Sequence, residues 1–252
     1  MQKYKYHGPF VSNQKLSAFA KKFLHKKRLE RSIKNLDESE IELVKDFIKP
    51  KTDSIDVGVY RGVYSYEMSK YSQFVHSFEP NPIIFNDLNK NLTKLSKKIK
   101  LYNCALSNQN KLMDLKVPIR NSQFGKKNYE EYYEMGKATI HIENNFQNFE
   151  KFEINTKKLD EIDFKNQISF IKIDVEGHEK EVIEGGLNII QEFKPKLLVE
   201  IEKKYTGINV STTINYINSL GYNSFIYINN SLKKTNEIKE LDMYNNYIFL
   251  PN

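Results

Sequence analysis

An apolar run that ends abruptly in charged residues constrains the fold more than any other part of the chain. Residues 170–179 read FIKIDVEGHE, so that Asp174, Glu176 and His178 follow directly on an expected buried strand. Ligands of open α/β sheets bind at the carboxyl edge of the strands. A second strand of this kind, SIDVG over residues 54–58, ends in the same way far upstream. Together the two motifs favour an enzyme over a scaffold.

After Pro50 the expected strands and helices alternate, which predicts an α/β fold with a mostly parallel sheet and helices on both faces. The strands are expected at residues 54–57, 74–78, 99–105, 170–174, 196–201, 225–228 and 247–250. The helices are expected at residues 62–71, 82–95, 179–192 and 211–220, the last capped by Ser211. Before Pro50 we expect one more helix over residues 37–49, with Asp37 and Glu40 in a capping arrangement.

Because the alternation begins only after Pro50, we expect the chain to have two parts. They are a basic helical arm over residues 1–50 and one α/β domain over residues 51–252. Residues 107–157, approximately, interrupt the alternation. Short alternating stretches at residues 112–117 and 149–154 predict two antiparallel strands that frame a tyrosine-rich insertion. Such an insertion either carries substrate contacts or is a surface loop without a role.

The net charge of +7 is concentrated at the amino-terminal end of the chain. Residues 1–31 contain nine lysine or arginine residues and one glutamate, so the rest of the chain is close to neutral. Apolar residues between Leu16 and Phe23 recur at helical spacing among these lysines. The arm therefore either packs on the domain as a solvated helix or docks on an anionic membrane or an acidic partner. A nearly neutral body makes a nucleic acid partner an unfavoured interpretation.

Cysteine content and hydropathy indicate a cytoplasmic protein. Cys104 is the single cysteine, which excludes a disulfide within the chain and a zinc site of four cysteines. No apolar run reaches the roughly 18 residues that a membrane span needs. The amino-terminal residues also lack the continuous apolar core of a signal peptide.

The stretch DVGVYRG at residues 56–62 has the pattern of a strand, a glycine turn and the start of a helix. Gly58 allows a sharp turn and a close approach to main-chain N–H groups, and Gly62 allows tight packing where the helix begins. A helix N-terminus favours a negative group nearby. The spacing differs from the GxGxxG pattern that binds a dinucleotide pyrophosphate. We therefore expect a single carboxylate, such as that of an amino-acid-like cofactor.

The second expected strand ends in an acidic residue, Glu79, within FEPNP at residues 78–82. An acid at this place can accept hydrogen bonds from both ribose hydroxyls of an adenosine. Pro80 and Pro82 fix the turn so that the carboxylate points toward the crevice. The alternative is a helix N-terminal acid that complements the helix dipole.

Four blocks of the chain carry a resemblance to a known family. They are IDVG with GVYS (residues 55–65), FEPNP with its following helix (78–91), NCALS (103–107), and LD with FIKIDVEGHE (159–185), followed by KPKLLVEIE. In these blocks the chain resembles FkbM-type S-adenosylmethionine-dependent methyltransferases over about residues 54–204. The resemblance implies a Rossmann-like class I methyltransferase fold with seven strands, six parallel and the last inserted antiparallel. It also implies methyl transfer, usually to a hydroxyl oxygen.

The resemblance, together with strand positions, assigns the candidate cofactor residues. Val59 and Tyr60, with Gly58 and Gly62, are expected at the methionine end, and Glu79 at the ribose. Family members commonly have Ala-Asn where this chain has Val59-Tyr60, which puts a bulky residue at the cofactor mouth. Cys104, Ala105 and Leu106 are expected beside the adenine, with Cys104 as a packed thiol rather than a nucleophile. The remaining cofactor candidates are Asp56, Tyr64, Ser65, Pro80, Asn81 and Asp174.

Methyl transfer to a hydroxyl requires alignment of the acceptor and removal of its proton. His178 is the first choice for the general base, because a histidine titrates near neutrality, and Asp174 and Glu176 are the other catalytic candidates. His178 is otherwise a helix N-terminal residue that is hydrogen-bonded to a neighbouring glutamate. In a metal-assisted version, Asp174 and Glu200 share a divalent ion such as magnesium with the acceptor.

Three functions remain open from the sequence. The first is O-methylation of a hydroxyl on a sugar, a glycan or a related metabolite. The second is methylation of a nucleic acid held by the basic arm, which is disfavoured by the neutral body and by the lack of a D/N-P-P-Y/F motif after residue 174. The third is a noncatalytic binding module that retains the methyltransferase fold.

Overall fold

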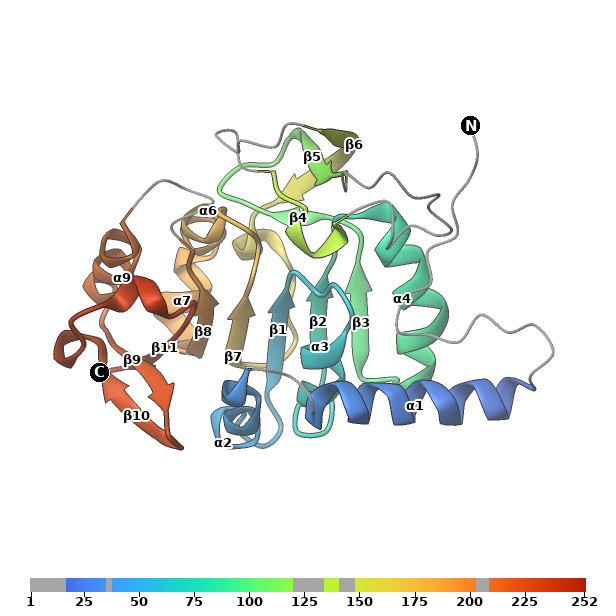
Figure 1. Cartoon of the computed structure of the whole chain (residues 1–252), viewed down its shortest axis with the longest axis horizontal. Coiled ribbons are helices and arrows are strands. Elements are labelled where there is room, and N and C mark those ends of the chain that lie inside the picture. Colours follow the sequence, from blue (N-terminus) through green and yellow to red (C-terminus); the bar gives the residue numbers. More distant parts are fainter. Residues whose placement is uncertain (1–16, 35–37, 120–133, 141–147, 203–208) are drawn as a thin grey trace.

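The computed structural model describes residues 17–34, 38–119, 134–140, 148–202 and 209–252. Figure 1 shows a central sheet with helices on its two faces, and a small second sheet beyond the carboxyl ends of the central strands. Within the described residues, no helix has the length and hydrophobicity that crossing a bilayer requires.

The central sheet has eight strands in the order β10-β9-β11-β8-β7-β1-β2-β3. Six of them run parallel, and β11 lies antiparallel between β8 and β9. This arrangement confirms the expected class I fold. The eighth strand, β10, was not expected and forms a hairpin with β9. The strands are β1 (Asp53–Val57), β2 (Val75–Phe78), β3 (Ile99–Tyr102), β7 (Ile168–Ile173), β8 (Lys196–Glu200), β9 (Tyr222–Ile228), β10 (Ser231–Lys234) and β11 (Asn246–Pro251).

The register of the parallel strands places the expected site residues next to one another at the same edge of the sheet. Val57 at the end of β1 pairs with Phe78 of β2 and with Ile173 of β7. The ladder continues for one residue beyond these ends, because the Gly58 N–H donates to the Phe78 carbonyl at 3.1 Å and the Asp174 N–H to the Val57 carbonyl at 3.0 Å. The residues that directly follow β1, β2 and β7 therefore lie side by side at the carboxyl edge.

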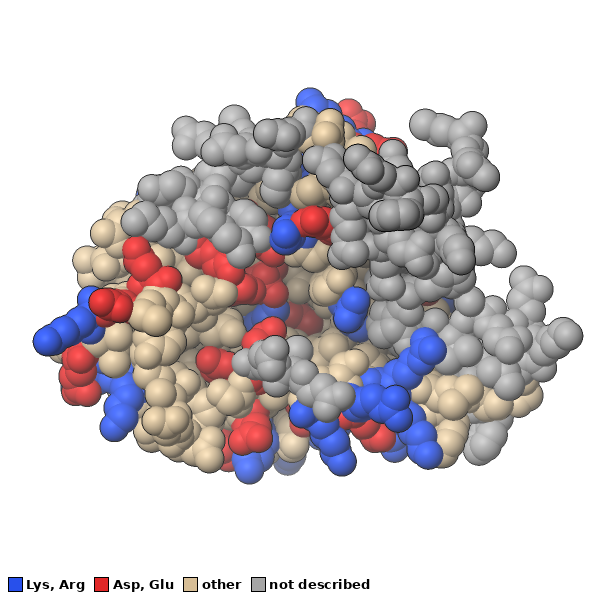
Figure 2. Space-filling view, viewed as in Figure 1, with Lys and Arg blue, Asp and Glu red and all other residues tan. Residues whose placement is uncertain are grey.

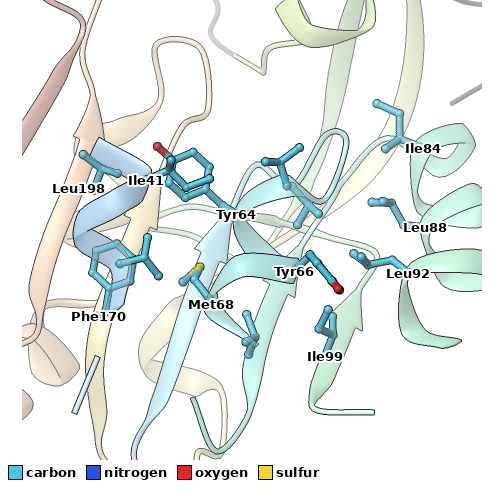
Figure 3. Packing of buried hydrophobic residues seen from close by; sticks show 14 of the residues in the cluster. Ile41, Tyr64, Tyr66, Met68, Ile84, Leu88, Leu92, Ile99, Phe170 and Leu198 are labelled. Carbon is cyan, nitrogen blue, oxygen red and sulfur yellow. The ribbon is translucent and has the colours of Figure 1, made fainter. Parts of the chain in front are cut away.

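Helices cover both faces of the sheet because each turns an apolar side toward it. One face carries α1 (Ala18–Lys34), α2 (Val44–Phe47), α3 (Val63–Met68) and α4 (Pro82–Leu95), and the other carries α6 (Glu179–Glu184), α7 (Leu187–Phe193) and α9 (Val210–Ser219). Figure 3 shows the first of these two cores, where Tyr64 and Met68 of α3 and Leu88 of α4 pack over the sheet. Each buried aliphatic side chain in such a core contributes about 1.5–3 kcal/mol relative to an exposed one.

The described part of the amino-terminal region packs into this first core. Leu29 of α1 is fully buried, and α1 lies against α3 and α4. The expected helix over residues 37–49 is wrong in its form, because a 3-10 helix, η1 (Ser39–Leu43), and one turn of α2 take its place. The side chain of Glu38, which precedes η1, makes no capping hydrogen bond, and Asp37 lies outside the described residues.

Two expected elements are divided in the structure. The helix expected at residues 179–192 is broken into α6 and α7 at Gly185-Gly186, because Gly185 packs on the main chain of Ser107, where a Cβ would lie 2.1 Å from the carbonyl oxygen. The strand expected at residues 99–105 ends at Tyr102, and β4 (Ala105–Leu106) joins the second sheet. The expected cap Ser211 is also wrong, since Asn209 is the N-cap of α9 and accepts the Ser211 N–H.

The second sheet has the order β4-β6-β5 and confirms the two antiparallel strands that were expected to frame the insertion. They are β5 (Leu112–Pro118) and β6 (Phe149–Lys157). Between them the structure describes residues 134–140, which include the 3-10 helix η2 (Met135–Lys137) and attach to β5 through a bridge between Thr139 and Lys116. Most of the tyrosine-rich middle of the insertion lies outside the described residues.

Candidate active site

A cavity opens at the carboxyl edge of the sheet, between the ends of β1, β2 and β7 and the second sheet. It encloses about 670 Å³ of empty space, including the part that is open to solvent. Its walls are formed by Val57, Gly58, Tyr60, Phe78, Glu79, Pro80, Ile84, Ala105, Leu106, Leu115, Met135, Gly136, Ala138, Ile140, Asp174, Val175, Glu176 and His178.

Gly58 allows the first strand to end directly against the β7 turn. Its φ is +86°, and a Cβ at this position would lie 1.8 Å from the Asp174 carbonyl oxygen. A side chain would therefore both strain the backbone and displace β7. Gly62, at the start of α3, is tightly packed as the sequence predicted, because a Cβ there would lie 2.7 Å from Leu92 of α4.

Glu79 is held rigidly at the end of β2. One carboxylate oxygen accepts the Tyr60 N–H and the other the Asn81 N–H, both at 2.9 Å. The side chain is buried, and burial raises its pKa to about 7, although the two backbone donors lower it. Each oxygen of a carboxylate can accept a further hydrogen bond. Glu79 can therefore receive hydroxyl donors from a ligand without losing its fixed orientation.

Asp56 lies in the floor below the cavity rather than in its walls. Its Oδ2 accepts the Ser65 hydroxyl at 2.5 Å, and its Oδ1 has no hydrogen-bond partner among the described residues. Burial raises the pKa of Asp56 to about 6, and the nearby Lys172 ammonium lowers it. A buried carboxylate oxygen without a partner is costly, which points to a ligand or ordered water beside it.

Lys172 supplies the positive charge beneath the site. It belongs to β7, it is buried, and its Nζ lies 2.6 Å from Asp174 Oδ2 and 4.7 Å from the centre of the Tyr64 ring. Burial alone would lower the pKa of Lys172, but the carboxylates of Asp174, Asp56 and Glu38 outweigh it and raise the pKa above its ordinary value. Lys172 is therefore the buried counter-ion of several acidic groups.

Asp174 and Glu200, at the ends of β7 and β8, form a hydrogen-bonded carboxyl pair. Burial, and then the adjacent Asp174, raise the pKa of Glu200 to about 10. No group of three or more histidine, cysteine, aspartate or glutamate side chains gathers to hold a metal ion within the described residues. The expected divalent ion at Asp174 and Glu200 consequently lacks a described ligand set, and a lysine already neutralises Asp174.

His178 lines the cavity and immediately precedes α6. Its Nε2 lies 2.9 Å from the Ser107 hydroxyl, and its Nδ1 lies 3.6 Å from a carboxylate oxygen of Glu181. The imidazole is buried, whereas the Asp174 side chain is 27% exposed. Asp174 is therefore the more accessible of the two candidate bases.

The turn that follows β7 is held in an unusual conformation. Glu176 has a φ of +56°, which is strained for a residue with a side chain, and its carbonyl accepts the Thr139 hydroxyl at 2.7 Å. The N–H of Gly177 donates to the Glu179 side chain at 2.9 Å. Tyr60, in the turn after β1, has a similar φ of +46°. Strained residues of this kind cluster at functional sites.

The structure brings most, but not all, of the sequence-predicted residues to the cavity. Those that line it are Gly58, Tyr60, Glu79, Pro80, Ala105, Leu106, Asp174, Glu176 and His178. Asn81 caps α4 and accepts the N–H groups of Ile83 and Ile84. Outside the walls lie Asp56, Val59, Gly62, Tyr64, Ser65, Asn81, Cys104 and Glu200.

Tyr64 and Cys104, two of the predicted residues that do not line the cavity, pack in the hydrophobic cores instead. The Tyr64 hydroxyl points to Glu38, to which it donates at 2.8 Å, and the side chain packs in the first core. The Cys104 thiol is buried in the second core, and burial raises its pKa, which agrees with a packed thiol rather than a nucleophile.

Sequence reasoning missed three groups of functional candidates. Lys172 was visible as a lone charge inside an apolar strand, a pattern that indicates a buried ion pair. The hydroxyl of Ser107 was part of a matched block, but nothing in the sequence linked it to His178. Residues 134–140 and Leu115 line the cavity only because the second sheet folds over the first, which no local pattern predicts.

The basic helix α1 lies away from the cavity. Figure 1 shows it near the amino ends of the central strands, while the cavity opens at their carboxyl ends. Figure 2 shows basic side chains along the lower right of the molecule, where α1 runs, and acidic side chains nearer the middle. The positive charge of the described arm is therefore poorly placed to hold a substrate at the cavity.

Comparison with known proteins agrees with this geometry. A family model described as the methyltransferase FkbM domain matches residues 56–224. The fold is similar to the crystal structure of a methyltransferase FkbM from Methylobacillus flagellatus KT, with 15% sequence identity and a TM-score of 0.50, over 94% of this chain and 56% of that one. The chain thus spans little more than half the length of that protein. No curated protein matches the chain significantly.

Two other solved structures share lower similarity. An rRNA methylase from Streptococcus thermophilus has 10% identity and a TM-score of 0.47, over 84% of this chain and 93% of that one. A magnesium protoporphyrin IX methyltransferase from Synechocystis PCC 6803, solved with bound S-adenosylmethionine, has 10% identity and a TM-score of 0.45, over 95% of this chain and 87% of that one.

Proposed function

Because the chain belongs to the methyltransferase FkbM family, we propose that it transfers the methyl group of S-adenosylmethionine to a hydroxyl of a sugar, a glycan or a related metabolite. The observation that carries this proposal is the cavity at the carboxyl edge, where Gly58, Glu79 and Asp174 meet from three different strands. These are the positions at which a class I fold binds an adenosyl ligand.

The residues around the cavity fit this cofactor. Glu79 presents two fixed carboxylate oxygens, which suit the paired hydroxyls of a ribose. Ala105 and Leu106 give an apolar edge that suits an adenine ring. Gly58 keeps the main chain open to a close approach of the ligand.

The protein itself then has only a few chemical tasks in the reaction. S-adenosylmethionine supplies a methyl group that is already activated by its sulfonium. The chain must hold the acceptor hydroxyl in line and accept its proton, and a positioned base contributes about 10²–10⁴-fold to the rate. We propose Asp174 as the proton acceptor, because its side chain is more exposed than that of His178 and its contact with the Lys172 ammonium, at 2.6 Å, fixes its position. His178, fixed by Ser107, then orients the acceptor or the Glu176 turn.

Replacement of Asp174 by asparagine tests this assignment. We expect kcat to fall by about 10²-fold or more, because the amide cannot accept the proton. The affinity for S-adenosylhomocysteine should change much less, since the role lies with the acceptor. Asp163→Asn, a change at an exposed carboxylate, is the matched control and should keep full activity. If Asp174→Asn instead loses the cofactor and keeps kcat, Asp174 binds the methionine end and is not the base.

The transfer itself is tested with methyl-labelled S-adenosylmethionine and a panel of saccharide and nucleic acid acceptors. We expect label in a saccharide, and we expect it to resist mild alkali, because an ether is stable where a methyl ester is hydrolysed. Label in RNA or DNA, with no label in any saccharide, would contradict the proposed acceptor class. Cofactor binding without transfer to any acceptor would favour a noncatalytic module.

A further inference from the structure

The described part of the insertion, residues 134–140, forms one wall of the cavity. Met135, Gly136, Ala138 and Ile140 of this segment line it, together with Leu115 of β5. The segment is well packed, since Met135, Thr139 and Ile140 are all buried. We call residues 134–140 the roof segment. The family motifs of the chain lie elsewhere, so nothing in them assigns a role to these residues.

The roof segment contacts the three turns that carry the candidate cofactor residues. At the turn after β1, the Tyr60 ring packs on Gly136, where a Cβ would lie 3.3 Å from the ring. At the turn after β2, the Asn81 side-chain amide lies 3.5 Å from the Met135 sulfur. At the turn after β7, the Thr139 hydroxyl donates to the Glu176 carbonyl at 2.7 Å.

The same segment is tied to the second sheet by main-chain hydrogen bonds. Thr139 and Lys116 exchange two of them, at 2.9 and 3.1 Å, and the Glu134 N–H donates to the Pro118 carbonyl at 2.9 Å. The roof segment is therefore anchored on one side to β5 and on the other side to the three turns. It cannot shift without disturbing the edge of the cavity.

Two residues in these three turns have strained backbone conformations. Tyr60 and Glu176 both have positive φ, a conformation that costs of order 1–3 kcal/mol for each residue and persists only when the surroundings hold it. The contacts to Gly136 and Thr139 provide such surroundings. The roof segment thus helps to fix the conformation in which the Tyr60 N–H reaches Glu79.

We propose that the roof segment is part of the cofactor site. Met135 and Ile140 supply an apolar wall for the adenosyl group, and Thr139 keeps the turn after β7 in its binding conformation. This inference rests on the proposed function, because it assumes an adenosyl ligand in the cavity. It adds residues of the insertion to the cofactor-binding set and makes Thr139 a positioning residue.

The test is calorimetric titration of the full chain with S-adenosylhomocysteine. We expect Thr139→Val to weaken binding about fivefold and Met135→Ala about tenfold, in line with the loss of one hydrogen bond or of one buried apolar contact. Thr93→Val is the matched control, since Thr93 also donates to a backbone carbonyl at 2.7 Å but lies exposed on α4. It should bind as tightly as the unchanged chain, and the titrations are made at a temperature at which thermal unfolding shows each variant to be folded.

The outcomes separate this inference from the proposed function. If the unchanged chain does not bind S-adenosylhomocysteine, the proposed function fails. If the unchanged chain binds it and Thr139→Val and Met135→Ala bind equally well, only the roof inference is overturned. If Thr139→Val does not fold, Met135→Ala decides alone. A titration with adenosine localises the effect, because the same loss should appear with this fragment if the roof segment contacts the adenosyl group, and a loss seen with S-adenosylhomocysteine alone would contradict that contact.

Discussion

Replacing Lys172 with methionine is expected to lower the free energy of unfolding by about 3–5 kcal/mol, the usual cost of removing one partner from a buried ion pair. The ammonium lies 2.6 Å from Asp174 and also faces the carboxylates of Asp56 and Glu38. Methionine fills a similar volume, so that packing is largely kept while the charge is lost. The acidic groups would then be left without their shared counter-ion inside the protein.

Chemical denaturation at neutral pH measures this effect. Because the pKa of Lys172 is raised in the folded state, its contribution is fully present below its ordinary pKa of 10.5 and is lost only at higher pH. Lys165→Met is the matched control, since Lys165 also pairs with an aspartate, Asp163, but both side chains are exposed. An exposed pair contributes about 0–1 kcal/mol. Equal losses in the two variants would contradict the role of Lys172 as a buried counter-ion.

The Lys172→Met variant should lose methyl-transfer activity as well as stability. Asp174 would lose the ammonium group that lies 2.6 Å from its Oδ2 and would no longer be held in place at the cavity. Even at a temperature where the variant is folded, we expect kcat to fall by about 10²-fold. Retained kcat in the folded variant would show that Lys172 acts on stability alone.

Replacing Gly58 with alanine is expected to have the second large effect, a loss of about 4 kcal/mol or more in stability. The new Cβ would lie 1.8 Å from the Asp174 carbonyl oxygen, and the φ of +86° would be strained for alanine. Relief of the clash must separate the ends of β1 and β7. It would break the hydrogen bond from the Asp174 N–H to the Val57 carbonyl.

Gly221→Ala provides the matched control for this prediction. Its φ of +90° is almost the same, but the nearest atom to its Cβ is the flexible end of Lys194, at 3.1 Å. Gly221→Ala should therefore lose only the stability that backbone strain costs, about 1–2 kcal/mol. Thermal unfolding of both variants measures the difference. If both lose the same stability, the close approach of β1 and β7 is not what requires Gly58.

The mostly parallel sheet with helices on both faces was predictable because strands and helices alternate along the chain. The carboxyl-edge rule placed Glu79 and Asp174 correctly at one cavity, since each directly follows a buried strand. The hairpin strand β10 was not predicted, because residues 231–234 are mostly polar and lie at an edge of the sheet. The break between α6 and α7 was missed because its cause, the carbonyl of Ser107, is distant in sequence.

The remaining parts of the site depend on contacts that a linear pattern does not contain. Asp56 is a cofactor candidate that does not line the cavity, and its contacts with Ser65 and Lys172 could not be predicted from the sequence. His178 was the first choice for the base, and its contact with the Ser107 hydroxyl could not be predicted from the sequence. The roof segment reaches the cavity through the second sheet, whose position relative to the first is set by tertiary packing.

The most direct test of the central claim, that an adenosyl ligand occupies the cavity and is held by Glu79, is a calorimetric titration with S-adenosylhomocysteine. The unchanged chain should bind one molecule, and Glu79→Gln should bind it at least about tenfold more weakly, because an amide cannot accept two hydroxyl donors and both backbone N–H groups. The absence of binding by the unchanged chain, or equal affinity in a folded Glu79→Gln variant, would contradict the claim.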